Sequence, residues 1–181
     1  MGQSLAGKNC KQKRKNLKKM TQEELEKLAE NLYYVIWMLN GTATLEACPK
    51  SVDKVLEDNA FLESFLVHTR ILIEFFYGVA NDKDTVLAKN FVDNWENYRD
   101  KDDRLAIGYL DEIRKRAHKL LAHLTKKGSL SNDQYRRWDR ITIRDEINRR
   151  IKCFLDLPDN NIPEDIKSKI LDILEKNPPR D

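Results

Sequence analysis

The chain has 181 residues, which is close to the size of one large domain and enough to bury a core without disulfides or a metal. Apolar residues make up 40% and charged residues 35% of it, and only six glycines and five prolines are present. Such a composition favours helices joined by few turns and argues against an all-β architecture. We therefore expect an all-α protein.

The formal net charge of +3 conceals a basic N-terminal arm. Residues 1–20 contain seven lysines or arginines and no acid, so the remainder has 26 basic (33 − 7) and 30 acidic residues, or −4. A basic arm on a mildly acidic body is typical of contact with nucleic acid or an anionic surface. The alternative, which we favour, is a solvated tail, because a segment of like charge and low hydrophobicity does not order itself. We expect residues 21–181 to form a single helical domain.

Cysteine usage and hydropathy indicate the compartment. Cys10, Cys48 and Cys153 are far apart and lack any Cys-x-x-Cys spacing, so they read as reduced thiols of a cytoplasmic protein. The longest uninterrupted apolar run, residues 32–39, is too short to cross a bilayer. We therefore expect no membrane partner.

The first predicted helix begins with a capping-box pattern, in which Thr21 is followed three residues later by Glu24. Apolar residues at helical spacing from Leu25 to Leu39 extend this helix until Gly41. Its second half, residues 32–39, is apolar on all sides. Such a helix must be covered either in the middle of a bundle or at a subunit interface.

A second helix is predicted within residues 51–77, because a broad apolar face runs along it until Gly78. His68 lies on that apolar line, so we interpret it as a core histidine with a satisfied hydrogen bond. Arg70 and Glu74 are spaced as an i,i+4 ion pair, which we favour over a ligand site.

The remaining elements are also helical. Residues 84–98 predict one or two short helices or a packed loop, and residues 102–125 predict a long amphipathic helix. Residues 131–133 supply a cap for another long helix that reaches Leu155, and Pro163 opens a last short helix. No segment alternates with period two. The prediction is an up-and-down bundle of four long helices with additional short helices.

The common catalytic motifs are missing from the sequence. It contains no His-Glu-x-x-His, no Gly-x-Ser-x-Gly and no glycine-rich phosphate loop. The Glu-x-x-His motif of di-iron bundles is also missing, because a different residue stands three positions before each histidine. We therefore expect neither a metal nor a cofactor.

The candidate catalytic residues are Arg116 and His123 on the long helix within residues 102–125. Seven positions amount to a net rotation of about 20°, so the two side chains share a stripe beside the buried face, and Lys119 accompanies them. A guanidinium can neutralise a phosphate and an imidazole can move a proton, which together suffice for metal-free phosphodiester cleavage. The alternative is a structural histidine, with Arg116 paired to Glu112.

Arg116 and His123, with six intervening residues, fit the R-x4-6-H motif of the HEPN superfamily of all-helical ribonucleases, toxins and abortive-infection proteins. Residues 65–76 and 119–125 also resemble uncharacterised bacterial members, and the similarity covers about residues 51–154. The resemblance implies a homodimer in which His123 is the general acid or base and Arg116 binds the scissile phosphate of RNA. Ala117 stands where members of the family usually carry a polar residue.

The helix that reaches Leu155 concentrates arginines, of which Arg137, Arg140 and Arg144 share one face. They form a candidate phosphate track, and the alternative, which we favour, is a solvated helix whose interspersed acids are their partners. The leading hypothesis is an RNA-binding protein and metal-independent endoribonuclease. The rival is a non-catalytic dimeric helical protein that acts by interaction with a partner.

Overall fold

The computed structural model describes residues 20–46, 53–78, 85–99, 104–122 and 138–178. In these ranges the chain forms six α-helices and one short 3-10 helix, and its only β-pairing is an isolated bridge. The all-α prediction is confirmed. The basic arm predicted in residues 1–20 lies outside the described residues, apart from Met20. None of the described helices combines the length and the apolar character needed to span a membrane.

The first helix, α1 (Gln22–Thr44), starts with the predicted capping box. Thr21 Oγ1 accepts a hydrogen bond from the Glu24 amide at 3.2 Å, and Glu24 Oε2 accepts one from the Thr21 amide at 2.7 Å. The helix continues three residues past Gly41, where we expected it to stop. Thr42 and Ala43 are buried there, so packing of the last turn outweighs the poor helix propensity of one glycine.

The second helix, α2 (Lys54–Tyr77), lies within the predicted range. Asp53 caps it by accepting a hydrogen bond from the Leu56 amide at 2.9 Å. The helix ends at Gly78, whose amide donates to the carbonyl of Glu74 at 2.7 Å. A Cβ at position 78 would collide with that same carbonyl oxygen, which explains why glycine stands at this helix end.

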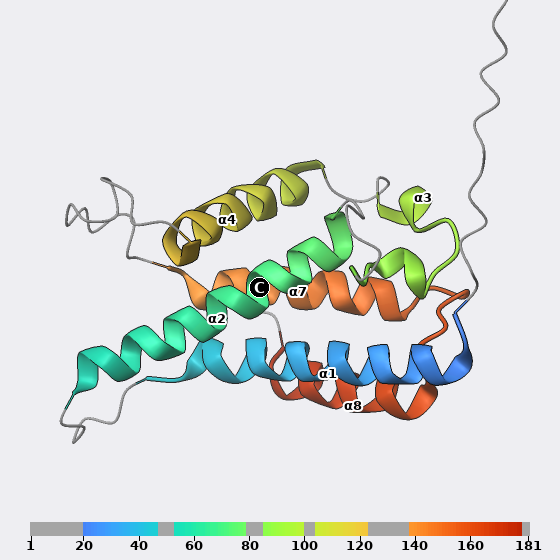
Figure 1. Ribbon diagram of the computed structural model, residues 1–181, viewed down its shortest axis with the longest axis horizontal. Coiled ribbons are helices and arrows are strands. Elements are labelled where there is room, and N and C mark those ends of the chain that lie inside the picture. Colours follow the sequence, from blue (N-terminus) through green and yellow to red (C-terminus); the bar gives the residue numbers. More distant parts are fainter. Residues whose placement is uncertain (1–19, 47–52, 79–84, 100–103, 123–137, 179–181) are drawn as a thin grey trace, which may run out of the picture.

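The helices pack around α1, which contacts α2, α7 (Arg140–Leu155) and α8 (Glu164–Lys176). Figure 1 shows α8 running alongside α1. The helix α2 crosses over α7, and α4 (Arg104–Ala122) packs on the side of α2 that faces away from α1. The helix α4 packs mainly on α2, which in turn packs on α1 and α7.

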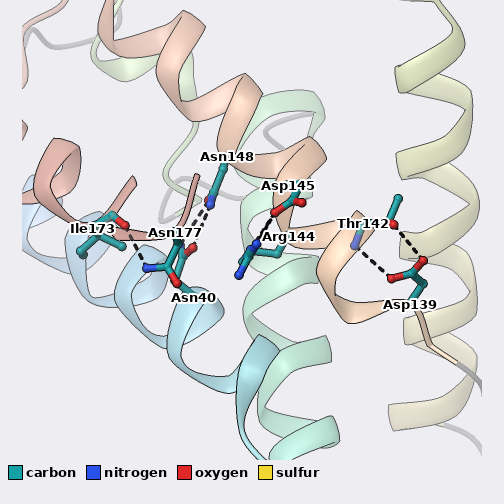
Figure 2. A network of polar contacts seen from close by, with 8 residues as sticks. All are labelled: Asn40, Asp139, Thr142, Arg144, Asp145, Asn148, Ile173 and Asn177. Atoms are coloured by element: carbon teal, nitrogen blue, oxygen red, sulfur yellow. Dashed lines mark hydrogen bonds and ion pairs between the residues drawn. The ribbon is translucent and has the colours of Figure 1, made fainter. Parts of the chain in front are cut away.

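The start of α7 differs from the prediction. Trp138 and Asp139 are not helical, and the helix begins at Arg140 instead of near residues 131–133. Asp139 is the N-cap, because its carboxylate accepts hydrogen bonds from the amide and the hydroxyl of Thr142 at 3.0 and 2.8 Å (Figure 2). Sequence reasoning did not single out Asp139 as a cap, yet α7 begins directly after it. Residues 131–137 lie outside the described residues.

Residues 85–99 hold the short 3-10 helix η1 (Ala88–Asn90) and the short helix α3 (Trp95–Arg99), as one of the predicted alternatives proposed. This segment is attached to the loop before α8, because the Asn161 amide and side chain both donate to the carbonyl of Phe91, at 2.9 and 3.0 Å. Edge-to-face ring contacts join it to the core, which contains the following buried aromatic residues: Phe75, Phe76, Phe91, Trp95 and Phe154.

A polar layer is buried between α1 and α7. Asn40 and Asn148 exchange two hydrogen bonds between their side-chain amides, at 3.2 and 2.8 Å, and both residues are 2% exposed (Figure 2). Asn40 also donates to the carbonyl of Ile36 at 2.9 Å. Because a buried amide is costly unless it is hydrogen-bonded, these bonds favour a single register of α7 against α1.

The N-terminal end of α7 is fixed to the last turn of α1. Arg140 Nη1 donates to the carbonyls of Thr42 and Leu45 at 3.1 and 3.0 Å. These carbonyls lie at the C-terminal end of α1, where unpaired acceptors and the negative end of the helix dipole favour a cation. Arg140 and Asn148 therefore hold α7 to α1 at two levels.

We predict that replacing Asn148 by alanine lowers the free energy of unfolding by about 1–3 kcal/mol, because the Asn40 amide then stays buried without this partner. Urea unfolding followed by circular dichroism measures the change. The double variant with leucine at positions 40 and 148 should recover part of the loss, because neither buried amide remains. Asn97, which is exposed in α3, provides the control, and Asn97→Ala should change stability by less than about 0.5 kcal/mol. Equal losses at positions 148 and 97 would contradict the account.

Candidate nucleic-acid interface

The helix α4 presents three kinds of surface. Leu110, Ile113 and Ala117 are buried on one stripe, at 1%, 3% and 0% exposure, and this stripe packs the helix against α2. The two flanks of the stripe carry different groups. Because Arg116 is two residues from both Arg114 and His118, it projects about 200° away from each of them on an ideal helix. The cations of α4 are thus divided between two flanks.

On one flank, α4 and α2 enclose a groove of about 150 Å³. Its lining is almost wholly basic and comes from two residues of α2 and four of α4: Arg70, Glu74, Arg114, Lys115, His118 and Lys119. We call these residues the basic groove. Sequence reasoning singled out only Lys119 among them as a binding residue. The sequence feature that could have indicated these residues is the run from Arg114 to Lys119, in which every position except Ala117 is basic.

Ion pairs hold several of these cations in place. Arg70 pairs with Glu74 at 2.9 Å, as the sequence predicted, and Asp111 pairs with Arg114 at 2.8 Å and with Lys115 at 2.7 Å. The hydrogen bonds from Lys115 and then Arg114 lower the pKa of Asp111, and the same contact raises the pKa of Lys115. Four permanent cations face two carboxylates in and beside the groove, so its net charge is +2 (4 − 2), with His118 uncounted.

On the other flank, Arg116 contacts the segment that leads into α7. Its guanidinium carbon lies 4.3 Å from the centroid of the Trp138 ring, which is a close cation–π contact. Burial raises the pKa of Tyr109, and the negative charge of Asp139 raises it further, while the charge of Arg116 lowers it. Tyr109, Arg116, Trp138 and Asp139 therefore form a second cluster, which joins α4 to the start of α7.

The structure separates the predicted site residues. Lys119 lies in the basic groove, whereas Arg116 lies on the opposite flank of α4. His123 and Arg137 lie outside the described residues. His68 is a core histidine, as predicted, because it is 8% exposed and its Nδ1 lies 2.6 Å from the carbonyl oxygen of Ser64.

The arginines of α7 have structural contacts. Arg140 binds the carbonyls at the end of α1, and Arg144 is 5% exposed and forms an ion pair with Asp145 at 2.5 Å (Figure 2). Arg149 pairs with Glu146 at 2.6 Å. Interspersed acids are therefore partners of Arg144 and Arg149, as in the alternative that we favoured. Arg144 is buried instead of solvated, however, because its guanidinium lies inside the helix packing.

Comparison of the chain with family models, curated proteins and solved structures found no match. The function proposed below therefore rests on the sequence and on the geometry of α2 and α4.

We predict that Arg116→Ala raises the pKa of Tyr109 further, because the guanidinium charge that stabilises the phenolate is removed. A pH titration of the Tyr109 ring carbon by NMR measures the value. Arg114→Ala is the matched control, since it removes the same charge from the other flank of α4 and should change the Tyr109 pKa less. An unchanged value in Arg116→Ala would show that Arg116 does not face Tyr109.

Proposed function

We propose that the protein binds RNA through the basic groove between α2 and α4. The observation that carries this proposal is the convergence of Arg70 from α2 with Arg114, Lys115 and Lys119 from α4 on one groove. Lysine and arginine side chains on one face supply most of the affinity of nucleic-acid-binding proteins, because each phosphate contact releases condensed counterions.

The ion pairs of the groove are compatible with such a role. The side chains of the Arg70–Glu74 and Asp111–Arg114 pairs are all more than a third exposed. Exposed pairs contribute only about 0–1 kcal/mol, so a phosphate can replace a carboxylate at little cost. The carboxylates also position the cations before the ligand arrives, which reduces the entropy lost on binding.

The resemblance to HEPN ribonucleases supports a catalytic extension of this proposal, in which RNA bound in the basic groove continues to Arg116 on the opposite flank of α4. In it, α1, α2, α4 and α7 form the up-and-down bundle of a cytoplasmic homodimer, and Arg116 and His123 of the two copies face each other. His123 takes the proton of a ribose 2′-hydroxyl, whose oxygen attacks the phosphorus while the 5′-oxygen leaves and gains a proton from the protonated His123 of the other copy. The products are a 2′,3′-cyclic phosphate and a free 5′-hydroxyl. Arg116 neutralises the phosphate, because its guanidinium carries a permanent positive charge.

We predict that Lys119→Glu weakens RNA binding by about tenfold at 0.1 M salt and reduces the slope of log K against log[salt] by roughly one. Fluorescence anisotropy with a labelled RNA measures both quantities. Lys169→Glu on α8 is the matched control, because it makes the same charge change at a side chain that is 55% exposed outside the groove. Equal losses in the two variants would contradict the groove and indicate an effect of net charge alone.

For the catalytic extension, we predict that His123→Ala abolishes RNA cleavage and leaves RNA affinity within about twofold, because the residue moves a proton instead of holding the ligand. Gel analysis of an end-labelled RNA in the presence of EDTA measures cleavage, and anisotropy measures binding. Cleavage that persists in His123→Ala would exclude the mechanism and leave the binding proposal intact.

A second candidate function is a non-catalytic interaction protein. It is favoured by Trp37, which leaves more than half of its surface uncovered on α1 although Ile36 beside it is buried. Light scattering of the wild type and of Trp37→Ala separates the two candidates. A dimer that dissociates in the variant, together with unchanged RNA affinity in Lys119→Glu, would favour the interaction protein.

A further inference from the structure

Two aromatic side chains stand exposed on α1 where α2 packs beside it. Tyr34 is 51% and Trp37 53% exposed, and their ring centroids are 6.3 Å apart. Tyr34 also makes an edge-to-face contact with His68 of α2, and the two ring centroids are 6.0 Å apart. On α2, Val67 and Ile71 lie one turn apart and are 40% and 42% exposed. We call Tyr34, Trp37, Val67 and Ile71 the aromatic face.

The aromatic face and the basic groove lie on the two sides of the same stretch of α2. Ile71 of the face is next in sequence to Arg70, which lines the groove. Figure 1 shows α2 between α4 and α1 on the viewed side of the molecule, so one ligand can contact all three helices. Packed helix axes lie about 8–10 Å apart, so the span from α4 to α1 is roughly twice this distance, which a few nucleotides cover.

We propose that the aromatic face is a base-stacking platform and that the ligand is single-stranded RNA, which crosses α2 with its phosphates in the basic groove. This inference rests on the proposed function. Exposed tyrosine and tryptophan rings beside a track of cations are the combination that binds single strands, because every unpaired base offers a π face. Bases of a duplex are stacked on one another and cannot reach Tyr34 or Trp37.

The size of the face argues against a second copy of the chain as its occupant. An aromatic side chain buries about 150–250 Å², so the uncovered halves of Tyr34 and Trp37 supply roughly 200 Å², to which the smaller Val67 and Ile71 add less than half of their own surface. A stable protein interface needs about 800 Å² from each partner. The adjoining surface on the α4 side is cationic, which repels an identical copy placed face to face and attracts a polyanion.

The test compares a single-stranded RNA of twelve uridines with a duplex RNA of the same length, both labelled for anisotropy. Loss of a stacked base weakens binding by about tenfold or more. We therefore expect Tyr34→Ala and Trp37→Ala each to weaken binding of the single strand by at least that factor. Duplex binding should stay within about twofold. Val55→Ala removes an apolar side chain that is 70% exposed at the start of α2 and should leave both affinities unchanged.

A second measurement uses the fluorescence of Trp37. Trp95 is buried and Trp138 is partly buried, so quenching on addition of the single strand should be lost in Trp37→Phe, which keeps an aromatic ring and most of the affinity. Unchanged single-strand affinity in both Tyr34→Ala and Trp37→Ala would overturn the base-stacking platform, even if these variants altered self-association. If Lys119→Glu still weakened RNA binding in that case, the groove would stand without the platform. A wild-type protein that bound neither RNA would refute the proposed function itself.

Discussion

The hydrogen bonds between Asn40 and Asn148 hold α1 against α7, and the other helices are placed relative to that pair. A shift of α7 by one turn would leave both amides buried without each other as partners, which is costly. Arg140 adds a second level of contact at the carbonyls that end α1. With α1 and α7 fixed, α2 crosses them both, and its outward side becomes the support for α4.

The attachment of α4 explains why its cations are divided between two flanks. The buried stripe of Leu110, Ile113 and Ala117 lies on α2, and Arg116 stacks on Trp138 at the start of α7. These contacts place the flank that carries Arg114 and His118 beside the C-terminal half of α2. Arg70 faces that flank because it lies outside the apolar face of α2. The basic groove is thus a consequence of how α4 is packed.

Local signals in the sequence predicted most of the fold. The capping box at Thr21, the helix end at Gly78 and the ion pair of Arg70 with Glu74 involve residues close together in the chain, and all three are confirmed. The start of α7 was predicted wrongly, because apolar periodicity does not reveal that the helix reaching Leu155 begins after Asp139, whose carboxylate accepts hydrogen bonds from Thr142.

The candidate site was harder to predict, because it depends on contacts between helices. Helical spacing predicted that Arg140 and Arg144 share a face of α7, but it does not show whether that face is exposed. Arg144 is in fact buried against Asp145. Spacing likewise could not bring Arg70 to α4, since 44 positions separate it from Arg114 (114 − 70). The pairing of Asn40 with Asn148 could not be predicted either, because the two residues are far apart in the sequence.

The central claim is that one surface, formed by α4, α2 and α1, binds RNA. Ultraviolet crosslinking of the protein to a 4-thiouridine RNA, with the modified peptides identified by mass spectrometry, tests it most directly. We expect crosslinks within residues 114–119 of α4 and at Tyr34 or Trp37 of α1, and their loss when unlabelled RNA competes. Crosslinks confined to α8 or to the exposed residues of α7 would contradict the claim.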